Sequence, residues 1–149
     1  MSKIYKVYKI ENGIVIDHIP NKKALSVLSV LGLDNEHDSL ITMGINLSSD
    51  KMNKKDVIKI ENRDLSVEEL NKIAIVAPNA SVNIIKDSII VKKFKASIPE
   101  TIRGIISCLN PNCITRNEDI ESIFYYDKDK NTIKCHYCER TFNQELIRL

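Results

Sequence analysis

Residues 108–138 read CLNPNCITRNEDIESIFYYDKDKNTIKCHYC, and this stretch holds all four cysteines of the 149-residue chain. Cys108 and Cys113 form one close pair, Cys135 and Cys138 form a second, and 21 residues separate the two pairs. Two close pairs with a spacer of this length are typical of a structural zinc site with four thiolate ligands. Each pair bends its own loop, so that two sulfurs can reach one ion at about 2.3 Å.

The spacer between the two pairs is predicted to form a β-hairpin. Ile123–Tyr126 and Thr132–Ile133 are rich in β-branched and aromatic residues, and the polar run 127–131 between them suits a turn. A segment of roughly 45 residues is near the lower limit for a self-sufficient core. A structural zinc would add on the order of 10–16 kcal/mol of apparent binding energy. We therefore expect a small all-β zinc-binding domain over residues 99–149.

Other interpretations of the cysteines are two disulfides or four unrelated free thiols, both less expected in a cytoplasmic chain. His136 lies inside the second pair and could replace one cysteine as a ligand. Four thiolates fill a tetrahedral shell and leave no position for water or substrate, so the zinc is expected to be structural. The glutamate that zinc deaminases carry beside their first ligand is also absent.

The rest of the chain differs in composition, because residues 1–107 contain no cysteine. This asymmetry indicates two domains, joined near Ser97–Thr101, where Pro99 disfavours both helix and strand pairing. The first domain is assigned to residues 1–98. Its candidate strands are Ile4–Ile10, Ile14–Ile16, Leu40–Leu47, Val57–Ile60, Val82–Ile85 and Ile89–Val91.

Two helices are predicted among these strands. Apolar residues recur at helical spacing before Gly32, which is placed to end the first helix, and the stripe comprises Ala24, Leu25, Val27, Leu28, Val30 and Leu31. Ser66 and Glu69 form a capping box that opens the second helix, and Pro78 stops it. The order is β-α-β-β-α-β with an extra strand at each end. The chain is thus predicted to be α+β, with an N-terminal ferredoxin-like antiparallel sheet and two helices on one face.

Composition limits the classes of function. The chain is 43% hydrophobic and 28% charged with a net charge of +2, and residues 101–149 hold seven basic and seven acidic residues. A nucleic-acid-binding zinc ribbon, the main rival hypothesis, would need a basic surface near the metal. A small zinc hydrolase is disfavoured by the closed shell. With no apolar run of 18 residues and no signal-peptide pattern, we expect a cytoplasmic protein without membrane or nucleic-acid partners.

No catalytic motif is present, and no residue is predicted to be catalytic. Asp17 and His18 end an apolar strand, where polar side chains emerge at a sheet rim. Lysines flank two further strands, and they could converge with this pair on a phosphate-bearing ligand: Lys54, Lys55, Lys59, Lys92, Lys93 and Lys95. The alternative is that Asp17 and His18 make turn hydrogen bonds and the lysines protect sheet edges.

Five segments together resemble the regulatory chains of aspartate carbamoyltransferase. They are GIVIDHIP (13–20), KKDVIKIEN (54–62), APNASVN (77–83), CLNPNCI (108–114) and KCHYCE (134–139). The resemblance covers nearly the whole chain and implies a non-catalytic regulatory subunit in pyrimidine biosynthesis. It implies that these chains pair through their N-terminal domains and that the zinc domains dock on catalytic trimers. CTP and UTP are implied inhibitors and ATP an implied activator.

The resemblance also implies residue roles. Asp17 should bind ribose, Lys59 should contact base and ribose, and the phosphates should face His18, Lys55 and Lys93. Residues implied to line the nucleotide pocket are Val7, Ile10, Val15, Val57, Asn83 and Ile90. Candidate contacts to the catalytic chain are Asn110, Asn112, Glu139 and Arg140. Lys92 stands where the family usually has a small residue, which bears on effector preference.

Overall fold

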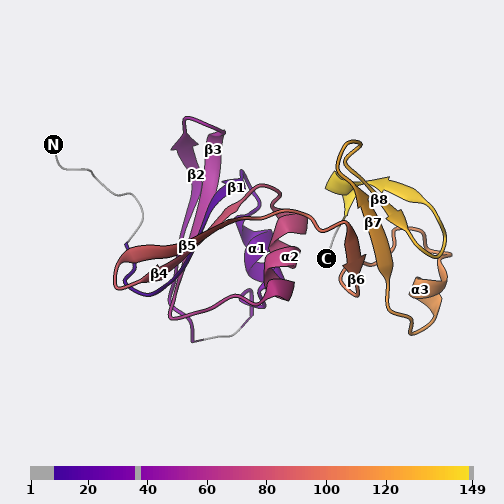
Figure 1. Ribbon diagram of the computed structural model, residues 1–149, viewed down its shortest axis with the longest axis horizontal. Helices are drawn as coiled ribbons and strands as arrows, with labels where there is room; N and C mark the ends of the chain where they lie inside the picture. The colour runs from indigo at the N-terminus through magenta and orange to yellow at the C-terminus, as the bar shows by residue number, and fades with distance from the viewer. Residues whose placement is uncertain (1–8, 36–37, 148–149) are drawn as a thin grey trace. The chain divides into compact units, whose positions relative to one another are not determined.

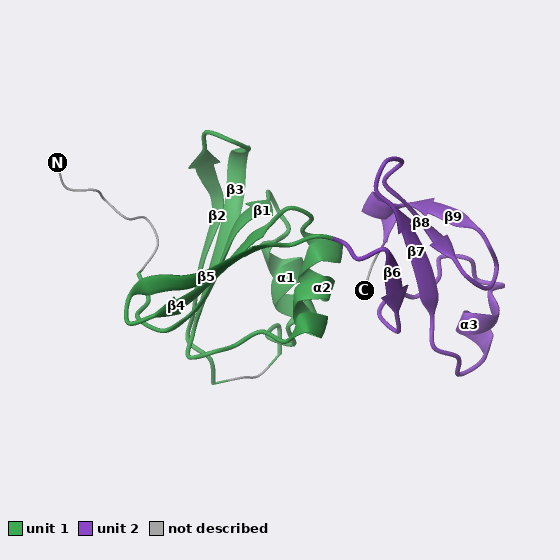
Figure 2. Ribbon diagram, viewed as in Figure 1, with its two compact units in different colours: residues 1–97 green, residues 98–149 purple. Residues whose placement is uncertain are grey.

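The computed structural model describes residues 9–35 and 38–147 and contains two compact units, residues 1–97 and 98–149 (Figures 1 and 2). Each unit has its own sheet and its own buried core. In the described part of the chain, no helix is both long and apolar enough to cross a bilayer.

The first unit is a five-stranded sheet with two helices on one face (Figure 1). Its strands are β1 (Gly13–Pro20), β2 (Ile41–Ser49), β3 (Asn53–Glu61), β4 (Ser81–Lys86) and β5 (Ile89–Lys95), and its helices are α1 (Ala24–Val30) and α2 (Val67–Val76). The strand order is β2-β3-β1-β4-β5, and all neighbouring strands are antiparallel.

The first four strands and the two helices have the order of a ferredoxin-like fold, and β5 adds an edge strand. The predicted fold class is confirmed for this unit. Of the expected strand Ile4–Ile10, residues 4–8 lie outside the described residues, and Lys9 and Ile10 are not in a strand.

Alternation along the central strands separates two faces of the sheet. Ile14 and Ile16 of β1 and Ile58 and Ile60 of β3 are fully buried toward the helices. The residues between them, including Val15 and Lys59, belong to the opposite face, which carries no helix.

The first helix buries a narrower stripe than the sequence predicted. Leu25 is 64% exposed, so its assignment to the apolar stripe was wrong. The buried residues are Ala24, Val27, Leu28 and Leu31, which follow the i, i+3, i+4, i+7 spacing of one helix face. Leu25 lies about 100° around the helix from Ala24, beyond the edge of that stripe.

The predicted helix boundaries are confirmed. The Ser66 hydroxyl accepts a hydrogen bond from the Glu69 N–H, and the Glu69 carboxylate accepts one from the Ser66 N–H, each at 3.1 Å. At the end of α1, Gly32 adopts φ +71° and the Leu33 N–H donates to the Leu28 carbonyl at 2.9 Å. This is the left-handed termination for which glycine is best suited.

The second unit is a small four-stranded antiparallel sheet. Its strands are β6 (Thr101–Arg103), β7 (Ile123–Asp127), β8 (Thr132–Cys135) and β9 (Thr141–Asn143), in that order. A four-residue helix, α3 (Ile114–Asn117), and a 3₁₀ turn, Gln144–Leu146, complete it. The predicted hairpin is confirmed, because β7 pairs with β8. Its core is formed by Ile102, Phe124 and Ile133, all nearly or fully buried.

Candidate functional site

The four cysteines of the second unit converge on one point. The sulfur atoms of Cys108 and Cys138 are 3.7 Å apart, as are those of Cys113 and Cys135, and all four lie within 4.8 Å of one another. A tetrahedral ion with metal–sulfur bonds of about 2.3 Å requires sulfur–sulfur distances of about 3.8 Å. A disulfide requires about 2.05 Å. The two-disulfide alternative is therefore wrong, and the geometry fits a zinc ion held by four sulfurs.

Backbone N–H groups surround this cluster and donate to the sulfurs. The two loops supply at least one such donor to each cysteine: Asn110 to Cys108, Thr115 to Cys113, Tyr137 and Cys138 to Cys135, and Arg140 to Cys138. Glu139 adopts φ +61° in the turn that brings the Arg140 N–H to the sulfur of Cys138. N–H donors favour thiolates over thiols, because a hydrogen bond to the charged form stabilises it.

The protein groups alone do not ionise all four thiols. Burial raises the pKa of Cys108 to about 12. Burial acts in the same direction on Cys113, but hydrogen bonds from Thr115 and from neighbouring thiols outweigh it and lower the pKa of Cys113 to about 7. A divalent cation would supply the missing positive charge and deprotonate the remaining thiols. The donor set therefore matches a resident zinc and no open coordination position.

His136 lies outside the cluster of sulfurs. Its Nδ1 is 2.7 Å from the Tyr125 hydroxyl oxygen, and the two rings meet edge to face. The alternative in which His136 replaces a cysteine is therefore not needed to complete the site.

The candidate docking residues beside the cysteines differ in exposure. Asn112, Glu139 and Arg140 are exposed. Asn110 is buried, and its Oδ1 accepts a hydrogen bond from the Asn112 N–H at 3.1 Å. Asn110 thus shapes the loop of the first cysteine pair from within.

A second polar cluster occupies the helix-free face of the first unit. The pairing of β1 with β3 shifts between Ile16 and Ile19, and within this bulge His18 adopts φ +56°. The His18 N–H donates to Asp17 Oδ1 at 2.6 Å, and Lys55 Nζ from β3 lies 2.9 Å from the same oxygen. The bulge thus joins Asp17 and His18 of one strand to Lys55 of the next.

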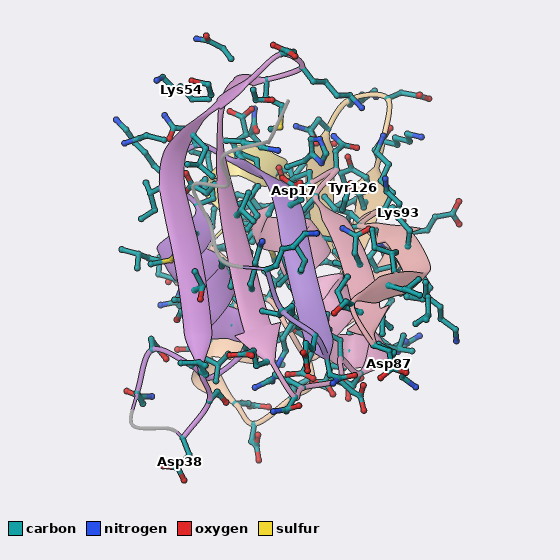
Figure 3. The ribbon with its side chains drawn as sticks, turned by 90° about the vertical axis from the view of Figure 1, so that its left-hand side faces the viewer. Asp17, Asp38, Lys54, Asp87, Lys93 and Tyr126 are labelled. Carbon is teal, nitrogen blue, oxygen red and sulfur yellow. The ribbon has the colours of Figure 1, made fainter. Side chains whose placement is uncertain are left out.

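A row of side chains crosses the same face from β3 to β5. Val15 pairs with both Lys59 and Asn83, and Asn83 pairs with Lys93. Directly paired residues share a face, so Lys59 and Lys93 flank Val15 and Asn83. Figure 3 looks onto this face and labels Asp17 and Lys93. Lys92 instead pairs with Ile84 and belongs to the opposite face.

The charges of Asp17, Lys55 and Lys59 shift the pKa values of Asp17 and Lys59. Burial alone would raise the pKa of Asp17, but the Lys55 ammonium, the His18 N–H and the nearby positive charges together lower it. Burial lowers the pKa of Lys59, partly offset by the Asp17 carboxylate, and Lys9 lowers it further. Asp17 is therefore a carboxylate at neutral pH that interacts with two lysines of β3, Lys55 and Lys59.

Two buried polar atoms near this row have no hydrogen-bond partner among the described residues. They are His18 Nδ1 and Asn83 Oδ1. Asn83 is only 7% exposed. A buried polar atom without a partner costs free energy, so such atoms are rare, and a water molecule or a bound ligand can supply the hydrogen bond that the protein does not.

The other expected pocket residues fall as follows. Ile10 and Val57 are buried, Val15 is half-buried, and Ile90 on the edge strand is 56% exposed. Val7 lies outside the described residues. Two further residues with structural roles, Thr115 beside Cys113 and the buried Asp56, were not predicted from the sequence. Thr115 follows a ligand cysteine by two residues, which was the available signal, whereas nothing in the sequence marks Asp56.

Both units match domains of the same protein family. Residues 5–97 match the model of the aspartate carbamoyltransferase regulatory chain, allosteric domain, and residues 100–148 match that of the regulatory chain, metal binding domain.

Three curated relatives match along nearly their whole length, and each is named aspartate carbamoyltransferase regulatory chain. That of Methanococcus maripaludis (strain S2) is 48% identical over 149 residues, covering 99% of each chain. That of Pyrococcus abyssi is 47% identical over 144 residues, covering 95% of each. That of Phocaeicola vulgatus is 44% identical over 145 residues, covering 97% of this chain and 93% of the other. With matches to the family's allosteric domain and metal-binding domain and to full-length relatives, this chain belongs to the family of aspartate carbamoyltransferase regulatory chains.

Proposed function

We propose that the chain binds CTP, UTP and ATP on the helix-free face of its first domain and thereby controls a separate aspartate carbamoyltransferase catalytic chain. The observation that carries the nucleotide site is the cluster of Asp17, Lys55 and Lys59 beside two buried polar atoms without partners, on His18 and Asn83. Family membership supplies the catalytic chain as partner and pyrimidine biosynthesis as the pathway.

The chemistry of this cluster suits a nucleoside triphosphate. Asp17, held as a carboxylate, can accept hydrogen bonds from ribose hydroxyls. Lys55 is half-buried beside Asp17, and a phosphate group would give its ammonium a second anionic partner. His18 and Lys93 would face the same phosphates. Lys59 can donate to ribose and base oxygens, and Asn83 Oδ1 can accept from a base amino group. Val15, Val57 and Ile10 provide apolar surface for the base.

A nucleotide can control the catalytic chain if it binds two states of the assembly with different affinity. If the assembly has two states, each nucleotide shifts the equilibrium by the difference between its affinities for them, typically ~1–3 kcal/mol. Residues 1–98 form the effector-binding domain, through which two regulatory chains pair. Residues 99–149 form the zinc domain, which docks on catalytic trimers. Asn112, Glu139 and Arg140 are proposed contacts, and Asn110 holds their loop.

Neighbouring lysines on opposite faces of β5 give a matched test of the nucleotide site. Lys93→Ala should weaken CTP binding about 10- to 150-fold, because a charged hydrogen bond to phosphate contributes about 1.5–3 kcal/mol. Lys92→Ala should leave binding within about twofold, since Lys92 pairs with Ile84 on the other face. Titration calorimetry with CTP and ATP on the zinc-loaded chain measures both. Equal losses for the two variants would contradict a site on this face.

Docking has an independent test. The chain is mixed with catalytic trimers, and complex formation is followed by sedimentation before and after zinc is removed with a chelator. We expect the metal-free chain to lose binding and to regain it when zinc is restored. Undiminished binding by the metal-free chain would contradict a zinc-dependent docking domain.

A further inference from the structure

Two side chains that are not ligands contact the sulfurs of the cysteine cluster. The Thr115 hydroxyl oxygen lies 3.1 Å from Cys113 Sγ. The side-chain amide of Asn110 hydrogen-bonds to Cys138, while its Oδ1 is occupied by the Asn112 N–H. The described residues thus provide one side-chain donor for one sulfur of each cysteine pair.

These contacts have an electrostatic consequence. Four thiolates around a divalent zinc leave a formal charge of about −2 on a centre in which three of the four cysteines are buried. Hydrogen bonds from a hydroxyl and an amide spread that charge and fix the direction of each sulfur lone pair. A thiolate held in this way is a poorer target for a proton or a competing electrophile, so its bond to zinc should break less often.

We propose that Thr115 and Asn110 are positioning residues that set how long the zinc stays bound, by donating to Cys113 and Cys138 respectively. The inference rests on the metal centre described above and adds to it two residues outside the ligand set. Arg116 reinforces the arrangement, because its guanidinium donates to the Cys108 carbonyl at 2.7 Å and ties α3 to the first cysteine loop.

A purely structural role for Thr115 would have different consequences. Thr115 lies in the four-residue helix α3, and a side chain there could serve only to hold the turn. In that case any residue of similar shape would suffice. If the hydroxyl matters, Thr115→Val, which keeps the shape, should weaken zinc retention, and Thr115→Ser, which keeps the hydroxyl, should restore it.

The two contacts of Asn110, one with the Asn112 N–H and one with Cys138, can also be separated by substitution. Asn110→Asp keeps an oxygen that can accept from the Asn112 N–H, but it replaces the amide donor to Cys138 with a second oxygen. The loop contact is retained and the sulfur contact becomes repulsive. The matched control for Thr115→Val is Thr141→Val, the same substitution at a threonine that is exposed on β9 in the same unit.

The experiment uses the full chain loaded with zinc and measures zinc transfer to a chromogenic chelator in excess. Loss of an outer-shell partner typically costs about 10–100-fold in metal affinity. Thr115→Val and Asn110→Asp should therefore release zinc about tenfold faster, whereas Thr115→Ser and Thr141→Val should match the unaltered chain. In cobalt-substituted protein, the sulfur-to-cobalt charge-transfer band should shift in the first two variants only.

Each outcome decides the proposal. Unchanged zinc release and an unshifted cobalt band in Thr115→Val and Asn110→Asp would overturn it, and so would a Thr115→Ser variant that loses zinc as fast as Thr115→Val. If Thr115→Val fails to fold, Asn110→Asp and Thr115→Ser still give the comparison. An unaltered chain without stoichiometric zinc would overturn the metal centre itself, which is a separate result.

Discussion

Asp56 shows how much one buried side chain can organise. It is fully buried on β3, and its two carboxylate oxygens accept hydrogen bonds from the Ala24 N–H at 3.1 Å and the Asn46 N–H at 3.0 Å. Ala24 begins α1, where Lys23 makes no side-chain cap, and Asn46 lies in a bulge of β2 with φ +63°. One carboxylate therefore serves as the cap of a helix and the support of a bulge.

Asp56→Asn should therefore destabilise the first unit. In the variant, an NH₂ group replaces one of the two carboxylate oxygens and faces a backbone N–H that then has no acceptor. Loss of such a buried hydrogen bond costs about 1–3 kcal/mol. Urea denaturation followed by circular dichroism measures the change in the free energy of unfolding. Asp50→Asn, in an exposed turn, is the control and should change stability by less than about 0.5 kcal/mol. An Asp56 variant as stable as the Asp50 variant would contradict the capping role.

Gly13 is required for a different reason. It has φ +141°, and a Cβ atom built on it would lie 2.1 Å from the Ile60 carbonyl oxygen of the neighbouring strand. Gly13→Ala should cost more than about 2 kcal/mol, since it adds a backbone clash to a left-handed strain of about 1–2 kcal/mol. Gly32→Ala meets no atom within 4 Å and should cost only the strain. Thermal unfolding of both variants checks the order, and equal losses would show that the clash relaxes freely.

Among the helices, α2 begins with the most complete set of end contacts. The Ser66–Glu69 capping box satisfies N–H groups at its start, and Arg63 pairs with the Glu69 carboxylate. Burial alone would raise the pKa of Glu69, but the hydrogen bonds from Ser66 and the Arg63 guanidinium together lower it below its ordinary value of 4.5.

The lowered pKa gives a pH-dependent stability. A carboxyl whose pKa is lower in the folded chain stabilises it above the unfolded value, and this contribution is lost as pH falls through the folded value. Glu69→Gln keeps the capping geometry but removes the charge. It should cost up to about 1 kcal/mol near pH 7, and the difference from the unaltered chain should shrink as pH falls below 4.5 and vanish once pH is below the lowered pKa of Glu69, where both side chains are neutral.

Urea unfolding at several pH values measures this difference. Glu68→Gln is the control, because the Glu68 side chain is 71% exposed and pairs with Lys72 within the described part of the chain. A Glu69 effect that persists unchanged at pH 3 would mean that the carboxylate charge is not the cause.

In the whole molecule, the two units depend on different sources of stability. The first unit has a core of strand isoleucines and helix residues, whereas the second has, among its residues up to 147, few large buried side chains besides its cysteines. Apparent zinc binding energy on the order of 10–16 kcal/mol is therefore a large share of what holds residues 98–149 together.

Removal of zinc should unfold the second unit and spare the first. Limited proteolysis with mass spectrometry after chelation should show cleavage within residues 98–149 and an intact fragment near residues 1–97. Zinc added back before protease should restore resistance. Cleavage spread evenly over both units would show that the first unit also needs the metal.

The sequence by itself determined the four cysteines that cluster, the capping box and the glycine that ends α1, and it indicated a division into two domains. These features depend on spacing or on local backbone chemistry, which a linear pattern records. Resemblance supplied the family and the roles expected of Asp17 and Lys59.

Only the tertiary structure decided which distant residues meet. The bulge at His18 sets Asp17 against Lys55, the register of β5 separates Lys93 from Lys92, and Asp56 reaches Ala24 across 32 residues of sequence. It also turned Leu25 outward and brought the Thr115 hydroxyl to Cys113. Strand register and side-chain direction follow from long-range packing, and a shift of one residue would reverse the face of every side chain.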